Sequence, residues 1–329
     1  MDWKGKRVLV TGSEGFIGSH LTEALVEKGA VVTALVKNNF QDNIGFIEEF
    51  QPEVRKKIKI VFSDINDSNA VMDVVKGQQV VFHLAAEISV PYSYVNPRTF
   101  VQTNVMGTFN MLMAAREHGV KKMLHMSTSE VYGTPDSVPI REDNQLKGQS
   151  PYSASKIGAE KIAESFYSSY DLPVVVVRAF NTYGPRQSAR AVIPTIITQA
   201  LFRDKILMGN EKPTRDFNYV GDTVAGLIKV AESDKLFGQV VNIGSGKEIS
   251  TGDLAKKILA LTGSSAKVVR DAKRLRPKNS EVMRLLADNT KVRKLTSWKP
   301  EVGLDEGLKQ TIEYIRAHPH LFKIGQYQI

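Results

Sequence analysis

Two polar segments of the sequence carry side chains that could perform acid–base chemistry. Tyr152 and Lys156 lie four residues apart in "PYSASKIGAE", so a helix would place them on one face. A phenol has a pKa of about 10, and a neighbouring ammonium ion would favour the phenolate and lower that pKa. The pair could therefore act as a general base near neutral pH.

The second polar segment, "TSEVYG", begins directly after an apolar run. Thr128, Ser129 and Glu130 present two hydroxyls and a carboxylate in succession. They are either the ordinary polarity of a loop or three groups delivered to a reaction centre. The segment alone does not distinguish these two interpretations.

A glycine-rich segment near the N-terminus predicts a binding site for a dinucleotide. In "VTGSEGFIGSHL", Gly12, Gly15 and Gly18 lie between a strand pattern and a helix pattern. The first glycine permits a tight turn, the second lets the backbone approach a pyrophosphate, and the third lets the helix pack closely on the sheet. The position between strand and helix is the context that this motif requires. A nicotinamide cation bound here would add to the positive charge that favours the phenolate of Tyr152 and lowers its pKa.

The second expected strand lacks the acid that commonly binds the adenosine ribose of NAD. It ends in "ALVKNN", with Val36 where the acid is expected and Lys37 next to it. Lys37 could bind the 2′-phosphate of NADP, or it could be a solvated surface residue. Asp64 is suited to hold the adenine edge, or it caps the following helix. The choice between NAD and NADP stays open.

Short apolar runs alternate with helical patterns in the first half of the chain. Nearly continuous apolar strands are typical of a parallel sheet that is covered on both faces. The alternation predicts an α/β fold with a Rossmann-type, doubly wound parallel sheet. The expected strands are 7–12, 31–36, 58–64, 79–86, 121–128 and 172–179, and the clearest helices are 98–118 and 151–169.

This alternation breaks after about residue 180. Helical patterns at 191–203, 222–233, 251–262 and 304–316 are separated by short strand candidates such as "QVVNIGS", residues 239–245. We assign these segments to a smaller C-terminal α/β lobe that binds the substrate. The expected division is a dinucleotide-binding domain, 1–178, and a substrate-binding lobe, 179–329, interleaved with the first.

The composition favours a soluble globular protein that binds anions. The chain has 329 residues and 44 Lys plus Arg against 35 Asp plus Glu, a formal net charge of +9. The basic residues are scattered and lack interleaved aromatics, so we expect no nucleic-acid partner. The absence of cysteine excludes disulfides and cysteine nucleophiles. The histidines lack metal-ligand spacing, so no metal is expected, and no apolar run suggests a signal peptide or a membrane span.

Segments along nearly the whole chain resemble the extended short-chain dehydrogenase/reductases that act on nucleotide sugars. They include "VTGSEGFIGSHL", "FHLAA", "STSEVYG", "PYSASKIGAE", "RAFNTYGPR", "RDFNYVGD" and "RPKNSEV", in the order of that family. The resemblance implies an enzyme with tightly bound NAD(P)+. It also implies a homodimer, formed through the helices around 98–118 and 151–169. The absence of cysteine fits a cytoplasmic location.

The resemblance extends to individual residues. It implies a dinucleotide contact at Gly12, Gly15, Phe16, Ile17, Gly18, Lys37, Asp64, Ile65, Leu84, Ala85, Ala86, Tyr152 and Lys156. It implies a substrate diphosphate held by Asn181, with Arg186, Arg215 and Arg276 as cations on the phosphate or uridine side. Arg215 could instead form an ion pair with Asp216.

The resemblance also implies the chemistry. Tyr152 would remove the proton of the sugar 4-hydroxyl while hydride leaves carbon 4, and Thr128 would hydrogen-bond that hydroxyl. Glu130 resembles the additional acid–base residue of the 4,6-dehydratases, with Ser129 in place of an aspartate found in some of them. Glu130 would take the carbon-5 proton. The leaving 6-hydroxyl would be protonated by Glu130 or by a group near Ser129.

The expected reaction is the 4,6-dehydration of UDP-N-acetylglucosamine to a 4-keto-6-deoxy or 4-keto-5,6-ene sugar. The details "ALVKNN" and "NTYGPRQSARAVIPTIITQAL" resemble bacterial dehydratases of that substrate most closely. A GDP-linked donor is an alternative. UDP-glucuronate decarboxylases share the Thr-Ser-Glu triplet, and a 4-epimerase would need no further acid–base group. A non-catalytic sensor of nucleotide sugar or NADP is a last alternative, which the intact Tyr152, Lys156 and glycines disfavour.

Overall fold

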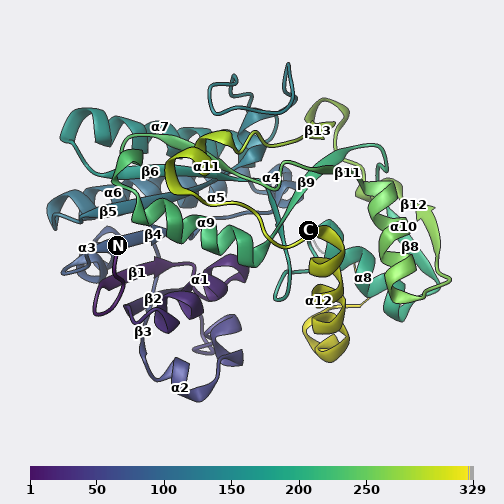
Figure 1. Cartoon of the computed structure of the whole chain (residues 1–329), viewed down its shortest axis with the longest axis horizontal. Coiled ribbons are helices and arrows are strands. Elements are labelled where there is room, and N and C mark those ends of the chain that lie inside the picture. The colour runs from purple at the N-terminus through teal and green to yellow at the C-terminus, as the bar shows by residue number, and fades with distance from the viewer. Residues whose placement is uncertain (325, 327–329) are drawn as a thin grey trace.

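The computed structural model describes residues 1–324 and 326. Seven parallel strands form the main sheet in the order β10-β6-β5-β4-β1-β2-β3 (Figure 1). This confirms the predicted doubly wound α/β fold. The strands are β1 (Arg7–Thr11), β2 (Val31–Lys37), β3 (Ile58–Ser63), β4 (Val80–His83), β5 (Lys122–Thr128), β6 (Val174–Ala179) and β10 (Val240–Ile243).

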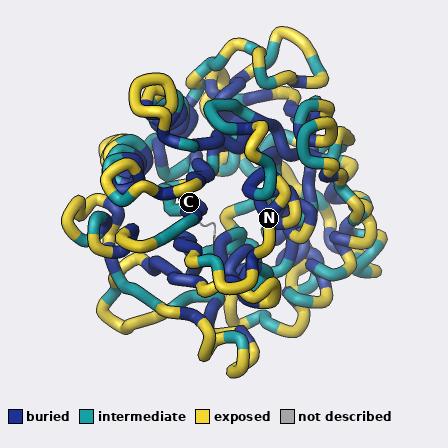
Figure 2. Tube along the Cα trace, turned by 60° about the vertical axis from the view of Figure 1, so that its left-hand side comes forward, coloured by how far each residue is buried: buried dark blue, intermediate teal, exposed yellow. Residues whose placement is uncertain are grey.

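Helices cover both faces of this sheet, because successive strand residues point to opposite sides. Val8 and Val10 of β1 pack with Leu25 of α1 on one side, whereas Leu9 packs with Met111 of α6 on the other. Figure 2 shows buried segments, in dark blue, in the interior and exposed segments, in yellow, at the periphery. The first face carries α1 (Phe16–Glu27), α9 (Val220–Glu232) and α11 (Thr290–Thr296), and the second carries α3 (Ser68–Val75), α6 (Gly107–Glu117) and α7 (Pro151–Tyr170).

The smaller lobe has its own apolar core, to which Ile196, Ile258 and Ile312 of three helices contribute. It lies at the right of Figure 1. Its helices are α8 (Val192–Phe202), α10 (Thr251–Thr262) and α12 (Leu304–Ala317). Its strands are β7 (Asn181–Tyr183), β8 (Lys205–Met208), β9 (Thr214–Tyr219), β11 (Glu248–Ser250), β12 (Lys267–Arg270) and β13 (Arg284–Leu285).

The chain crosses between the two lobes several times. The "QVVNIGS" segment, assigned from sequence to the smaller lobe, instead supplies β10, which pairs with β6 in the main sheet. The helix α9 likewise packs on α1, in the first layer. The sequence of a short apolar strand does not show to which sheet it belongs, because tertiary contacts decide which strand it pairs with. The limits 1–178 and 179–329 stay a prediction, and the second range ends outside the described residues.

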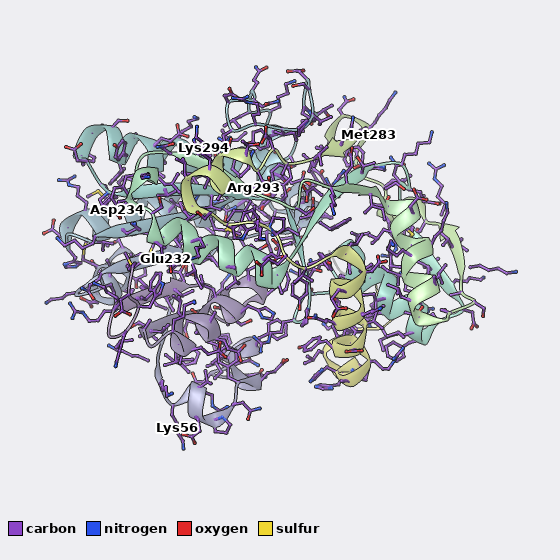
Figure 3. All side chains as sticks on the ribbon, viewed as in Figure 1. Lys56, Glu232, Asp234, Met283, Arg293 and Lys294 are labelled. Atoms are coloured by element: carbon purple, nitrogen blue, oxygen red, sulfur yellow. The ribbon has the colours of Figure 1, made fainter. Side chains whose placement is uncertain are left out.

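Shorter elements connect these parts. They are η1 (Gly45–Glu49), α2 (Pro52–Arg55), α4 (Val90–Val95), α5 (Pro97–Phe100), the π-helical turn η2 (Val101–Met106), η3 (Ser129–Tyr132), η4 (Asp234–Leu236), η5 (Ala272–Arg274), η6 (Lys278–Ser280) and η7 (Pro319–Leu321). Basic side chains are spread over the surface, such as Lys56 beside α2 and Arg293 and Lys294 on α11 (Figure 3). None of the helices in the described part of the chain is long and apolar enough to cross a membrane.

Candidate active site

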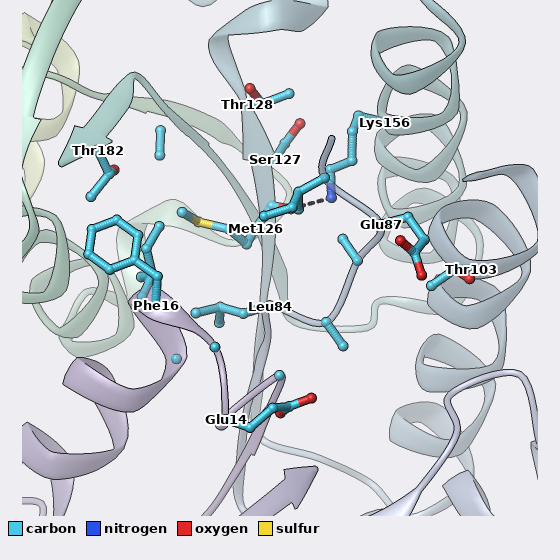
Figure 4. Close-up of a pocket in the computed structure, with 18 of the residues that line it drawn as sticks. Glu14, Phe16, Leu84, Glu87, Thr103, Met126, Ser127, Thr128, Lys156 and Thr182 are labelled. Atoms are coloured by element: carbon cyan, nitrogen blue, oxygen red, sulfur yellow. Dashed lines mark hydrogen bonds between the residues drawn. The ribbon is translucent and has the colours of Figure 1, made fainter. Parts of the chain in front are cut away.

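A cavity of about 400 Å³ lies at the carboxyl edge of the main sheet (Figure 4). In a doubly wound sheet, ligands bind at this edge, near the point where the strand order reverses. Here that point lies between β1 and β4, which are neighbours in the sheet. The cavity is lined by every residue expected to contact the dinucleotide: Gly12, Gly15, Phe16, Ile17, Gly18, Lys37, Asp64, Ile65, Leu84, Ala85, Ala86, Tyr152 and Lys156.

The glycine-rich loop brings the start of α1 close to the end of β1. A Cβ atom on Gly18 would lie 2.0 Å from the carbonyl oxygen of Gly12, so only glycine permits this approach. Among the described residues, no side chain caps the first turn of α1, and that turn holds no acidic residue. Its backbone N–H groups are therefore available to an anion, as a pyrophosphate site requires.

Asp64 follows β3 and lines the cavity. Its Oδ1 accepts a hydrogen bond of 2.9 Å from the backbone N–H of Asn66. The cap of α3 is Asp67, whose carboxylate accepts from the N–H groups of Asn69 and Ala70. The alternative interpretation of Asp64 as the helix cap is therefore wrong.

The helix α7 delivers Tyr152 and Lys156 to the cavity. The helix begins with a reciprocal pair of side-chain hydrogen bonds between Ser150 and Ser153, which fixes its first turn. Tyr152 is 8% exposed and Lys156 is 4% exposed. The Lys156 ammonium donates a 2.6 Å hydrogen bond to the carbonyl of Met126, and the side chain of Tyr152 interacts with that of Thr128. The two side chains therefore reach the end of β5 together.

Burial dominates the ionisation of both groups. Burial raises the pKa of Tyr152 to about 12, the hydrogen bond with Thr128 opposes this rise, and the charge of Glu130 adds to it. Burial lowers the pKa of Lys156 to about 8, against the opposing charge of Glu160. The lowered tyrosine pKa was expected with a nicotinamide cation present; in the protein alone, burial and the charge of Glu130 outweigh the interaction with Thr128. Any phenolate at neutral pH requires further positive charge.

We therefore expect Tyr152 to stay neutral when the cofactor-free protein is titrated through the range of an ordinary tyrosine. A phenol is neutral below its pKa, so a value of about 12 predicts no ionisation of Tyr152 at pH 10, where an exposed phenol is about half ionised. The measurement is the tyrosinate absorbance of the wild-type protein minus that of Tyr152→Phe, with circular dichroism to show intact folding. A difference curve with its midpoint near or below pH 10 would contradict this value.

The triplet Thr128–Ser129–Glu130 lies beside this pair, where β5 ends. The Thr128 hydroxyl accepts a 3.2 Å hydrogen bond from the N–H of Glu130, and Thr128 and Ser129 line the cavity. Glu130 is 9% exposed and its charge acts on Tyr152. Its carboxylate lies 3.4 Å from the guanidinium of Arg276. Ser129 and Glu130 are therefore buried and not part of a solvated loop, although Glu130 itself is not among the residues that line the cavity.

The four expected substrate-binding residues do not gather at one place. Asn181 lines the cavity, and its buried Oδ1 has no hydrogen-bond partner among the described residues. Arg215 and Arg276 lie beyond the triplet, and both interact with the charge of Glu130. Arg186 instead lies at the first helical layer, with its guanidinium 2.9 Å from the carboxylate of Glu23. The structure therefore offers no contact that supports a substrate role for Arg186.

Arg215 does not pair with its neighbour Asp216, as the alternative interpretation proposed. Its guanidinium lies 3.7 Å from Glu281. The carboxylate of Asp216 accepts hydrogen bonds from the backbone N–H groups of Ser245, Gly246 and Ala287. Neighbouring residues of a β-strand point to opposite faces, which explains why the two side chains have different partners.

Several residues of the site were not anticipated. Glu14, Glu87, Thr103 and Gln187 also line the cavity. Thr103 lies in the π-helical turn η2, a type of turn that is common at functional sites but has no clear sequence pattern. Glu14 lies between two glycines of the motif, at a position where the motif specifies no residue type, so the sequence did not mark it as a site residue. Only the folded chain brings Glu87 and Gln187 to the same edge.

The cavity, the glycine loop and the buried Tyr–Lys pair define the class of this protein. The residues present fit a dinucleotide: α1 offers free N–H groups, Gly18 permits their approach, and Glu14 and Asn181 each have a buried oxygen with no partner in the described part of the chain. Together these features identify the protein as an extended short-chain dehydrogenase/reductase. The cofactor of this class is a tightly bound NAD(P).

The comparisons with known proteins define the family. Residues 9–311 match the family model described as GDP-mannose 4,6 dehydratase, and the chain belongs to that family. A UDP-N-acetyl-alpha-D-glucosaminuronate decarboxylase from Bacillus cytotoxicus is 37% identical, over 94% of this chain and 98% of the relative. A UDP-glucose 4-epimerase from Mycolicibacterium smegmatis is 34% identical, over 94% and 98% of the two chains.

A solved structure is similar over nearly the whole length. The dTDP-glucose 4,6-dehydratase DesIV from Streptomyces venezuelae, solved with NAD bound, superposes with a TM-score of 0.85. It is 29% identical, and the match covers 96% of this chain and 99% of that one. The relatives thus include a dehydratase, an epimerase and a decarboxylase. The protein is an NAD(P)-dependent enzyme that modifies nucleotide sugars.

Proposed function

We propose that this protein is a nucleotide-sugar 4,6-dehydratase, with UDP-N-acetylglucosamine as its substrate. The observation that carries the proposal is the position of Glu130. Glu130 directly follows Thr128 and Ser129, which line the cavity together with Tyr152, and its charge acts on the Tyr152 phenol. A 4-epimerase needs no such carboxylate, whereas a dehydratase needs a base for the carbon-5 proton.

In the proposed reaction, Tyr152 and Glu130 each transfer a proton at a defined atom of the sugar. When bound, NAD(P)+ would supply the hydride acceptor for carbon 4, and its reduced form would supply that hydride to carbon 6 after elimination, while a proton from solvent restores carbon 5. Tyr152 takes the proton of the 4-hydroxyl, which is oriented by the hydroxyl of Thr128. The resulting 4-ketone makes the carbon-5 proton acidic, and Glu130 removes that proton. The protonated Glu130 can then protonate the 6-hydroxyl as it leaves as water.

Ser129 has no role in these transfers that requires its hydroxyl. It is 2% exposed and lines the cavity next to the base. A carboxyl group that has just gained a proton is an adequate acid, so Glu130 alone can serve both steps. A water held near Ser129 is the alternative proton donor.

Recognition of the substrate rests on the groups beyond the triplet. Asn181 offers a buried amide beside the cavity, and Arg215 and Arg276 offer two guanidinium groups. Arginine binds phosphate oxygens in a planar, bidentate geometry. These groups suit the diphosphate of a nucleotide sugar, whether the nucleotide is UDP or GDP.

One observation favours a second function, the decarboxylation of a nucleotide-linked uronic acid. Arg276 lies 3.4 Å from Glu130, so a cation stands beside the reaction centre. Such a cation could hold the carboxylate of a uronic acid at carbon 5. A relative that is 37% identical is named as a decarboxylase of this kind.

An NMR assay with the purified protein distinguishes these functions. In deuterated water, UDP-N-acetylglucosamine should give a 4-keto product that lacks the 6-hydroxyl and carries deuterium from solvent. Parallel reactions with GDP-N-acetylglucosamine and UDP-glucose test the donor and the sugar, and two UDP-linked uronic acids, with and without the N-acetyl group, test decarboxylation. Carbon dioxide release from a uronic acid, or a simple C4 epimer, would contradict the dehydratase proposal. No turnover of any substrate would favour a sensor.

The proposal includes the expected homodimer. Val101 and Met106 of η2 are 52% and 49% exposed, beside α7 in the helical layer where the interface is expected. Burying such apolar side chains between two subunits is favourable. We expect Val101→Glu combined with Met106→Glu to convert a dimer to a monomer in sedimentation velocity. Val269→Glu, in the smaller lobe, is the matched control, and a monomeric wild type would contradict the proposal. A cytoplasmic location stays a prediction.

A further inference from the structure

Glu14 lies inside the glycine-rich loop and lines the cavity. Its Oε1 accepts a 3.0 Å hydrogen bond from the backbone N–H of Lys37, the last residue of β2. Its Oε2 is buried, and it has no hydrogen-bond partner among the residues that the structure describes. A buried carboxylate oxygen without a partner is costly. The fold therefore keeps one acceptor of Glu14 free at the end of β2.

The segment after β2 holds Glu14 in this position. The N–H of Phe46 donates a 3.1 Å hydrogen bond to the carbonyl of Glu14. A Cβ atom on Gly45 would lie 2.4 Å from that carbonyl oxygen and 2.8 Å from the Cβ of Glu14. This close packing fixes the backbone of Glu14, so its carboxylate is positioned before any ligand binds.

Lys37 is not a free cation. Its ammonium lies 3.1 Å from the carboxylate of Glu87. Burial lowers its pKa, but the hydrogen bond and charge of Glu87, and the charges of Asp64 and Glu14, together raise it. Three carboxylates thus surround a single ammonium ion. Another dianionic group at this end of the cavity would meet a net negative field.

Figure 4 shows Glu14 at one end of the cavity and Thr128 and Lys156 at the other. A dinucleotide with its reactive ring beside Tyr152 would therefore place its adenosine half near Glu14. The end of β2 commonly supplies an acid to that ribose. In this chain the strand ends in Val36 and Lys37, and the carboxylate reaches the same place from the glycine loop.

We propose that Glu14 accepts a hydrogen bond from the 2′-hydroxyl of the adenosine ribose, and that it makes this protein specific for NAD. The hydroxyl gives the free Oε2 the donor that it lacks. The 2′-phosphate of NADP has no proton to donate at its dianionic oxygens and repels the carboxylate. This inference rests on the dinucleotide site alone and not on the proposed reaction.

Calorimetry with protein stripped of nucleotide tests this specificity. We expect the wild-type protein to bind NAD at least about tenfold more tightly than NADP, as for a hydrogen bond to a charged group. Glu14→Gln should weaken NAD binding by about tenfold and reduce the preference for NAD. In Glu14→Gln combined with Glu87→Gln, Lys37 is released, and NADP should bind more tightly than it binds the wild type.

Glu48→Gln is the matched control, because Glu48 belongs to the same segment and accepts from the N–H of Ile44. It should leave both affinities unchanged. Equal or tighter binding of NADP by the wild type would overturn the proposal, as would an unchanged ratio in folded Glu14→Gln. If the nucleotide cannot be removed under native conditions, denaturation and mass spectrometry identify it. Release of NAD supports the proposal and release of NADP overturns it, whatever the sugar assay gives.

Discussion

Replacing Glu130 with glutamine should abolish dehydration while leaving the oxidation of carbon 4 possible. The substitution keeps the size of the side chain and removes the only carboxylate of the triplet. The carbon-5 proton then has no base, so we expect dehydration to slow by on the order of 10²–10⁴-fold. Tyr152, Thr128 and Lys156 remain, so hydride can still leave carbon 4.

Two signals separate these steps in Glu130→Gln. Absorbance of the reduced nicotinamide should appear when the sugar nucleotide is added, whereas NMR should detect neither a 6-deoxy product nor exchange of the carbon-5 proton. Glu53→Gln is a suitable control, because that carboxylate is exposed and pairs only with Lys56 among the described residues. Dehydration at the wild-type rate would show that Glu130 is not the base.

Replacing Tyr152 with phenylalanine should stop the first step. In the proposed reaction the phenol accepts the proton of the 4-hydroxyl, and Tyr152 interacts with Thr128, which would orient that hydroxyl. Without the acceptor, hydride cannot leave carbon 4 at a useful rate, and we expect a loss on the order of 10²–10⁴-fold. No reduced nicotinamide should accumulate, which distinguishes this variant from Glu130→Gln.

The control for the tyrosine variant lies on the same helix. Tyr170 is at the far end of α7 and is 50% exposed, so Tyr170→Phe should keep full activity. Because Tyr152 also lines the dinucleotide cavity, the bound cofactor is quantified in both variants, which separates a loss of the first step from a loss of cofactor. Normal reduction of the bound cofactor by Tyr152→Phe would contradict the assignment of this tyrosine as the base.

The pKa of Tyr152 in the structure differs from the value expected from the sequence, and the difference has a physical cause. The i, i+4 spacing with Lys156 correctly placed both residues at one site, because helix geometry is local. The spacing did not reveal that both side chains are buried, and in the protein alone burial raises the pKa of Tyr152. The expected lowering also relied on a nicotinamide cation, and a bound oxidised cofactor would supply that positive charge.

The arginines also show that a sequence does not predict which distant side chains meet. From the sequence, Arg215 and Arg276 were the expected cations for the phosphate or uridine side and Arg186 an additional candidate, each within a short motif of the second half. The fold pairs Arg186 with Glu23 and brings Arg276 to Glu130. Residues 130 and 276 are far apart in the chain, so their contact depends on how the second lobe returns to the first. No local pattern encodes that contact.

By itself, the sequence determined the class of fold, the glycine loop, the Tyr–Lys pair and the triplet, because each follows from a short local pattern of backbone and side-chain preferences. The tertiary structure decided which segments meet. It placed β10 in the main sheet, joined Glu130 to Arg276, and set the carboxylate of Glu14 at an end of β2 that carries no acid. These contacts join distant parts of the chain and depend on packing and desolvation, which a linear sequence does not display.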